Sequence, residues 1–105
     1  MPVDARTVQP MRLLHGGASV VLAETVGSVA TTMCIKDWSK NAGVGIEINA
    51  NHIRSAKSGF VIATATPIKL GSTLHVWRIV IKREDGKQVC ESRITMAIID
   101  INKTK

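Results

Sequence analysis

Two groups of residues near the start of the chain could do chemistry together: His15-Gly16-Gly17 and Glu24. The glycine pair is typical of a tight turn that opens a helix, and the first N–H groups of a helix are free to hold negative charge. Glu24 lies within the apolar stretch Val20–Val29. We therefore expect its carboxylate to be buried in a helix that is apolar on nearly all sides. An oxyanion site beside a buried carboxylate indicates an enzyme for acyl transfer or hydrolysis. These residues leave alternatives open: a plain tight turn for the glycines, and for Glu24 an exposed helix glutamate or a buried one paired for structure.

The spacing of these groups carries a second inference. Gly16 and Glu24 are eight residues apart, which is about 12 Å along a helix. One substrate carbonyl cannot easily contact both in the same subunit, so the spacing predicts a symmetric dimer in which two antiparallel helices share their sites. Ser28 follows Glu24 by four residues and lies on the same helix face. It could orient the carboxylate or a water, or bond to its own helix backbone.

The elements that must position these groups can be predicted from local patterns. Residues 1 to 14 are expected to be the end of an extended segment and then a loop through Gln9-Pro10. A helix is expected from about Gly17 to about Cys34. Its many β-branched residues give it poor intrinsic propensity, so burial must stabilise it. Asp37 to Gly43 has loop composition.

Four strand-like runs follow the helix: Val44–Asn51, Gly59–Leu70, Thr73–Arg83 and Gln88–Ile101. Turn residues separate them at Arg54–Ser58, Gly71-Ser72 and Asp85-Gly86. We expect hairpins at all three joints and an antiparallel sheet with one face on the helix, which is an α+β fold. Pro67 predicts an edge position or a bulge in the second run. Trp77 and Phe60 are predicted to pack, and His75 to be structural.

Composition limits the class of protein. The 105 residues make one small domain, and a hydrophobic fraction of 45% suits a folded chain. Cys34 and Cys90 do not make a disulfide framework, and we expect reduced thiols and a cytoplasmic location. The first residues, Met1 to Asp4, do not have the pattern of a signal peptide. No apolar run is expected to be long enough to span a bilayer.

The net charge of +6 favours an anionic partner. Nucleic acid is disfavoured because aromatic residues make up only 3% of the chain and no recognisable motif is present. The only tight basic group is Lys103 with Lys105, which we interpret as a solvated end. A phosphate-rich ligand such as coenzyme A explains the charge at least as well. The histidines and cysteines show no zinc spacing, so no metal is expected.

Several strings resemble the hotdog-fold thioesterases, in particular the small acyl-CoA and aryl-CoA branch. That branch includes the menaquinone-pathway hydrolases and the proofreading thioesterases of enterobactin synthesis. The matching strings are Gln9-Pro10, LLHGGASVVLAETVGSVA (13–30), VGIEINANHIRSAKSG (44–59), PIKLGSTLHVW (67–77) and SRITMAI (92–98). They cover nearly the whole chain in order, so residues 1–105 are expected to form one hotdog thioesterase domain.

The chain departs from the family pattern in two places. The family normally has a further helix and strand ahead of Pro2-Val3-Asp4, so the chain is expected to begin inside that strand. Any missing strand would expose a sheet edge and thin the substrate pocket. Met11-Arg12 stands where the family usually has Phe-Gly. We therefore expect an acyl pocket of altered shape and polarity.

The resemblance implies a role for each matching residue. Glu24 is the general base or nucleophile, and the Gly16 and Gly17 N–H groups polarise the thioester carbonyl. Gln9 and His15 line the thioester site, although His15 could equally act as a helix cap. His52 lies near the pantetheine, or is a solvated histidine at a strand end. The implied substrate-binding and coenzyme A-binding residues are Gly45, His52, Ile53, Arg54, Ser55, Lys69, Leu70, Gly71, Ser72, Thr73 and Leu74.

The leading hypothesis is thus a thioesterase for acyl-CoA or aryl-CoA, with coenzyme A as part of the substrate and no separate cofactor. The resemblance also implies a dimer or a dimer of dimers. A thioesterase for acyl carrier protein and a catalytically impaired acyl-CoA-binding protein are the alternatives. Taken alone, the two polar turns at Arg54–Lys57 and Lys69–Thr73 would be ordinary solvated turns; the resemblance places the nucleotide end of coenzyme A there.

Overall fold

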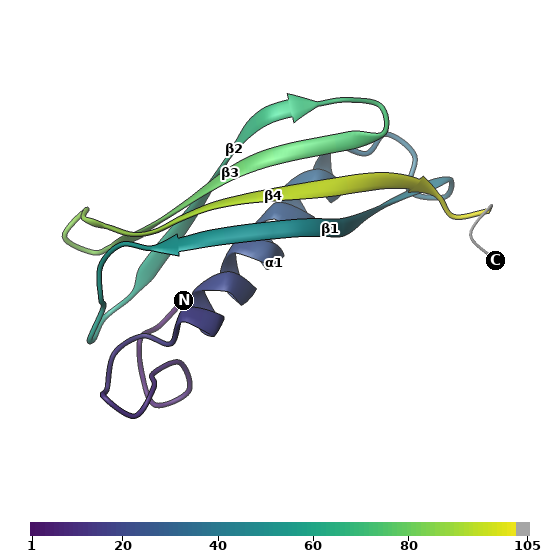
Figure 1. The fold of residues 1–105 in the computed structure, drawn as a ribbon. Helices are drawn as coiled ribbons and strands as arrows, with labels where there is room; N and C mark the ends of the chain where they lie inside the picture. The colour runs from purple at the N-terminus through teal and green to yellow at the C-terminus, as the bar shows by residue number, and fades with distance from the viewer. Residues whose placement is uncertain (103–105) are drawn as a thin grey trace.

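The computed structural model describes residues 1–102, and it consists of one long helix packed on one face of an antiparallel sheet (Figure 1). The elements are α1 (Gly16–Cys34), β1 (Asn41–His52), β2 (Val61–Leu70), β3 (Leu74–Arg83) and β4 (Gln88–Asp100). The predicted α+β class is confirmed, as is the helix to within one residue. The predicted tail group of Lys103 and Lys105 lies outside the described residues.

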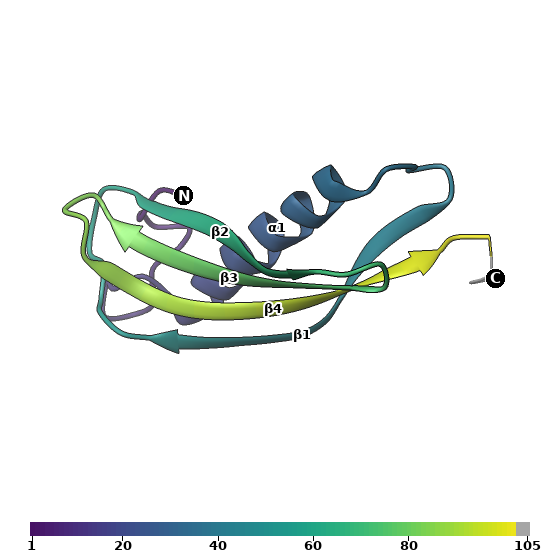
Figure 2. The ribbon, with the colours of Figure 1, turned by 90° about the horizontal axis from the view of Figure 1, so that it is seen from above.

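A stripe of small side chains holds α1 to the sheet. Ser19, Ala23, Gly27 and Thr31 are the buried residues of the helix, and their spacing of four places them on one face. The approach is close: a Cβ atom on Gly27 would lie 2.6 Å from Ile94 Cγ2 on β4. Figure 2 shows the helix lying across one side of the sheet. Because the stripe is narrow, the rest of the helix surface is left uncovered.

This exposure corrects the expectation of a helix buried on nearly all sides. Val21 is 64% exposed, Val29 53% and Met33 77%. The helix is also long and apolar enough to cross a membrane when judged by length and composition alone, so the expectation that no run reaches that length is wrong. In the structure it packs on the sheet through its small-residue stripe, as the core helix of a folded domain does.

The strand order is β1-β4-β3-β2. The hairpins at Gly71-Ser72 and Asp85-Gly86 are confirmed, but the hairpin expected between the first two strands is wrong. β1 pairs with β4, and residues 53–60 carry the chain to the opposite edge of the sheet. This linker is anchored on the way, since Arg54 Nη1 donates to Gln88 O and Arg83 Nη1 donates to Ser55 O. Such anchoring involves residues distant in sequence, which local turn signals do not contain.

Pro67 lies where a strand can accommodate a residue without a backbone N–H. It lies in β2, an edge strand, and the pairing register shifts between Pro67 and Lys69. Both options that the sequence left open, an edge and a bulge, are therefore present. Proline is tolerated there because no ladder hydrogen bond needs its missing N–H.

The first residues extend the sheet past the start of β2. Val3 N–H donates to Gly59 O at 2.8 Å, and Val61 N–H donates to Met1 O at 2.9 Å. A second short bridge joins Val8 to Leu14 across the loop that follows. The expected extended segment followed by a loop is confirmed.

The core lies between α1 and the inward-facing residues of β3 and β4. Trp77 is buried as predicted, together with Ile79, Ile81, Ile94 and Met96. Phe60 does not pack as predicted and is 55% exposed. Its neighbour Val61 is fully buried, so the alternation of side chains in an extended segment turns Phe60 to the opposite face. Cys34 is exposed and Cys90 is buried, and both are free.

One buried polar network joins the helix to the sheet. Trp77 Nε1 donates to Thr31 Oγ1 at 2.8 Å, and His75 Nδ1 lies 3.2 Å from the same hydroxyl. All three side chains are buried. His75 is thus held in the core through its Nδ1, by a partner that could not be foreseen from the sequence.

Replacing Thr31 with the isosteric valine tests this network. Thr31→Val leaves two buried nitrogens without their partner, and we expect the free energy of unfolding to fall by about 1–3 kcal/mol. Thr32→Val is the matched control, since the Thr32 hydroxyl is exposed and bonds only to Ser28 O. That variant should stay within about 0.5 kcal/mol of the wild type in urea denaturation. Equal losses in the two variants would contradict the role given to the network.

Candidate active site

The opening of α1 presents one free backbone donor. His15 is the N-cap residue, and its Nδ1 accepts the Gly17 N–H at 2.8 Å. The capping role is therefore what the structure shows for His15. The Gly17 N–H is engaged, which departs from the expectation that both glycine donors face a carbonyl. Among the described residues, nothing accepts from the Gly16 N–H, so this group is available for a ligand.

His52 lies against this opening. A Cβ atom on Gly16 would lie 3.0 Å from His52 Nε2 and 3.3 Å from Cε1. The end of β1 thus brings His52 to the helix N-terminus, and the missing side chain at Gly16 makes room for the imidazole. The sequence separates these residues by 36 positions. The structure joins them into one polar site.

Glu24 is exposed, which corrects the expectation that it is buried. It stands next to the buried stripe, not within it, because only every fourth residue of α1 reaches the sheet. It lines one hollow with Gly45, Ile46 and Ile94, and a second with Val21, Ser28 and Val29. Ser28, predicted to lie on the same helix face as Glu24, shares the second hollow with it. Gly45, expected only as a substrate-binding residue, lines the first. No described side chain bonds to the Glu24 carboxylate, which leaves it free to react.

Gln9 lies in the loop ahead of the helix and stabilises that loop. Its N–H donates to Leu13 O, and its side-chain Oε1 accepts from the Met11 N–H. Arg12 has a φ of 65°, a conformation that glycine adopts at little cost and other residues rarely do. The Met11 side chain is largely exposed. In this chain the Met11-Arg12 pair therefore forms a surface turn, and neither residue belongs to a hollow around Glu24.

The two turns expected to hold phosphates lie at opposite ends of the sheet. Ile53 bonds to Val89 O at the start of β4, and Arg54 and Ser55 follow it. The segment from Lys69 to Leu74 joins β2 to β3 at the other end. Between Leu74 and Lys82, β3 runs eight residues, or about 26 Å. One chain therefore does not bring the two turns together.

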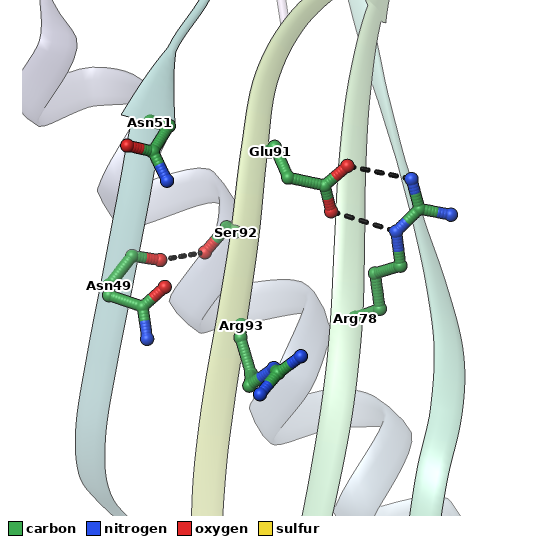
Figure 3. A pocket seen from close by; sticks show the side chains of 6 residues that line it. All are labelled: Asn49, Asn51, Arg78, Glu91, Ser92 and Arg93. Carbon is green, nitrogen blue, oxygen red and sulfur yellow. Dashed lines mark hydrogen bonds and ion pairs between the residues drawn. The ribbon is translucent and has the colours of Figure 1, made fainter.

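A further hollow, which the sequence did not predict, lies on the sheet face away from α1 (Figure 3). It is lined by Asn49, Asn51, Arg78, Glu91, Ser92 and Arg93. Arg78 Nε and Nη2 donate to the two oxygens of Glu91 at 2.8 and 2.6 Å. These bonds and one from Gln88 hold the pKa of the Glu91 carboxyl at about 2. The sequence held one signal for this hollow. In a strand, alternate side chains share a face, so Glu91 and Arg93 place their charges on the same side of the sheet.

The described residues also contain no group of three or more His, Cys, Asp or Glu side chains placed to hold a metal ion.

The comparisons with known proteins agree with this architecture. Residues 11–90 match the thioesterase superfamily. The chain is 56% identical over 99 residues to the 1,4-dihydroxy-2-naphthoyl-CoA hydrolase of Escherichia coli, a match that covers 94% of this chain and 71% of that protein. It is 46% identical over 99 residues to the proofreading thioesterase EntH of Cronobacter sakazakii, with the same coverage of 94% and 71%.

The crystal structure of a thioesterase from Haemophilus influenzae has a TM-score of 0.93 and 49% identity, over 99% of this chain and 71% of that one. A long helix held by an antiparallel sheet in this way is the hotdog fold, which confirms the predicted resemblance. The chain belongs to the thioesterase superfamily, and it is a thioester hydrolase.

The Glu91 carboxyl gives a test at acid pH. Its pKa in the folded chain is about 2, below the ordinary value of 4.5. A lowered pKa stabilises the fold above about 4.5 and loses that contribution as pH falls towards 2. We expect the difference in unfolding free energy between the wild type and Glu91→Gln to shrink over this range. The difference in unfolding free energy between the wild type and Arg78→Gln should shrink in the same way. If either difference did not depend on pH, the Arg78–Glu91 pair would not be the cause of the lowered pKa.

Proposed function

We propose that this protein hydrolyses acyl-CoA or aryl-CoA thioesters, with Glu24 of one chain and the Gly16 N–H of another acting on the same substrate. The observation that carries the proposal is the Glu24 carboxylate, which is unpaired among the described residues and opens onto two hollows with apolar walls. The coenzyme A part is supported by relatives whose names include a CoA hydrolase at 56% identity.

The need for two chains follows from the helix itself. Glu24 lies eight residues beyond Gly16 in a continuous helix, which separates the two by about 12 Å. The apolar side chains beside Glu24, Val21 and Val29, are exposed in the single chain. β1 is an edge strand that pairs with β4 on one side. An antiparallel second copy along β1 and α1 would cover these side chains and bring its Gly16 to Glu24.

The same arrangement accounts for the two separated turns. Arg54 and Ser55 lie at the end of β1, and Gly71 and Ser72 lie at the opposite end of the sheet. In an antiparallel pair, the end of the sheet that carries Arg54 in one chain lies beside the end that carries Gly71 in its neighbour. We therefore propose that one coenzyme A molecule contacts the turn at Arg54 from one chain and the turn at Gly71 from the other. Cationic and hydroxyl side chains suit its phosphates.

The reaction can follow either of two routes. As a base, Glu24 takes a proton from water, the hydroxide adds to the thioester carbon, and the oxyanion accepts the Gly16 N–H. The thiolate then leaves and receives the proton from Glu24. As a nucleophile, Glu24 adds to the same carbon and expels the thiolate, and water then adds to the glutamyl carbonyl of the acyl–glutamate anhydride, which releases the carboxylic acid and restores Glu24. During a single turnover, oxygen from labelled water would enter Glu24 by the second route only.

Other residues assist either route. Ser28 shares a hollow with Glu24 and is placed to orient the carboxylate or the water. His52, which lies against Gly16, and Gln9 are proposed to border the thioester. Neither route requires a metal or a cofactor beyond the coenzyme A of the substrate. The cytoplasm remains the proposed location, on the evidence of two free thiols.

Glu24→Gln tests the catalytic carboxylate. The amide keeps the size of the side chain but can neither accept the proton nor form the anhydride. We expect kcat for benzoyl-CoA, followed by release of free thiol, to fall about 10²–10⁴-fold. Glu84→Gln, at the β3–β4 hairpin, is the control and should retain full activity. Unchanged activity in Glu24→Gln would refute the proposal. A strong preference of the wild type for a carrier-protein thioester over its coenzyme A counterpart would show that the carrier-protein thioester is the substrate.

Mixing two inactive variants tests the shared site. Glu24→Gln and Gly16→Val are unfolded together and refolded, so that chains of both kinds meet in one dimer. Each mixed dimer keeps one site with an intact Gly16 and an intact Glu24, and random mixing should restore about a quarter of the wild-type activity. Mixed dimers verified by native mass spectrometry that have no activity would show that each site lies within one chain.

A further inference from the structure

His75 is a buried histidine that the proposed mechanism does not use. It is 6% exposed, and it lies at the start of β3, at the end of the sheet nearest the C-terminus of α1. Thr31 Oγ1 accepts the Trp77 Nε1–H and lies 3.2 Å from His75 Nδ1. Among the described residues, the bonded partners of the Thr31 hydroxyl are these two ring nitrogens, and of the two only Nδ1 can accept a hydrogen, because an indole nitrogen only donates. We assign the Thr31 hydroxyl as the donor to Nδ1, and this assignment places the ring hydrogen of His75 on Nε2.

This Nε2–H is directed into a cavity. No described residue bonds to it, and no buried side-chain nitrogen or oxygen among these residues lacks a partner. Nε2 must therefore be reached by solvent, and the route is a cavity of about 440 Å³ that His75 lines. This cavity lies between the C-terminal end of α1, the start of β1 and the turn from β2 to β3. The site thus presents a nitrogen donor whose tautomer is set by the core.

Asn41 and Cys34 also line the cavity, and Asn41 Nδ2 already donates to Ile99 O. Two further groups can donate to a ligand. Lys36 contributes an ammonium group, and Ser72 contributes a hydroxyl. Ile35, Leu70 and Ile98 supply apolar walls. The nearby helix end would repel an anion. However, its Thr32 carbonyl already accepts both the Ile35 N–H and the Trp38 Nε1–H. Three donors, one of them a cation, favour a ligand rich in negative oxygen atoms.

We infer that this cavity binds a phosphate-type oxyanion through His75 Nε2–H, the Ser72 hydroxyl and the Lys36 ammonium group. The inference deepens the proposed function, because it adds Lys36 and His75 to the turn at which coenzyme A phosphates are proposed to bind. The imidazole is held by Trp77 and Thr31 before the ligand arrives, so little ordering is needed on binding. His75 thereby acts as a ligand-binding residue at the far end of the helix from Gly16.

Nuclear magnetic resonance of the three imidazoles tests the site without hydrolysis. The wild-type chain is titrated with inorganic phosphate and, in a second arm, with adenosine 3′,5′-bisphosphate, the nucleotide end of coenzyme A. We expect His75 in the free protein to carry its ring hydrogen on Nε2, and we expect its ring signals to shift during the titration. Lys36→Ala should weaken the affinity about tenfold. Lys87→Ala removes one charge at the opposite end of the sheet and is the matched control, which should leave the affinity unchanged.

The outcomes are distinct. A His75 shift with both ligands supports a phosphate end of the thioester site, and a shift with inorganic phosphate alone supports a free-phosphate site. An unshifted His75 ring in both arms, a ring protonated on Nδ1, or equal weakening by Lys36→Ala and Lys87→Ala would overturn the inference. Because binding is measured on a chain with intact Glu24, failure here would not affect the catalytic proposal, which depends on Glu24→Gln.

Discussion

α1 approaches the sheet so closely that a methyl group on Gly27 would collide with Ile94. Such contact is possible only along a stripe of small residues, and Ser19, Ala23, Gly27 and Thr31 form it. The narrowness of this stripe governs the rest of the helix surface. Glu24 and the apolar side chains around it remain uncovered in one chain, although an isolated helix of this composition would be poorly stable in water. Close packing on one side of the helix thus leaves an exposed carboxylate, unpaired among the described residues, on the other.

The length of α1 separates the two groups that the proposed reaction uses. The free Gly16 N–H lies at its first residue, and Glu24 lies two turns further on. Because the Gly17 N–H is bonded to His15, only the Gly16 N–H remains as a free amide donor among the described residues of the helix opening. A substrate that uses both groups must lie between two helices. The exposed valines beside Glu24 supply the apolar surface that such a partner would cover.

The two ends of the molecule differ in how they are held. At the helix N-terminus, His52 lies against a glycine and the linker 53–60 is anchored by arginine bonds to backbone carbonyls. At the helix C-terminus, a buried hydroxyl joins two rings of β3 to α1 and aims the second nitrogen of His75 at a cavity. Buried polar groups of this kind are retained when all partners are satisfied, because an unpaired one is costly. Both ends therefore present preorganised polar groups.

Local signals in the sequence were sufficient for most of the secondary-structure elements. The helix from Gly17, the Asp85-Gly86 hairpin and the irregularity at Pro67 depend on neighbouring residues, and all three are observed. The pairing of β1 with β4, the exposure of Glu24 and the exposure of Phe60 could not be predicted in this way. Each depends on which face of an element meets a partner far along the chain.

The amino-acid sequence by itself determined the secondary structure, the family and the residue types available for thioester chemistry, since these follow from patterns within short stretches. Only the tertiary structure decided that Gly16 meets His52, that Gly17 is already bonded, and that His75 opens into a cavity. The physical reason is that packing a helix on a sheet buries one stripe and leaves the others open. Which stripe is buried depends on the shape of the surface it meets, and distant residues build that surface.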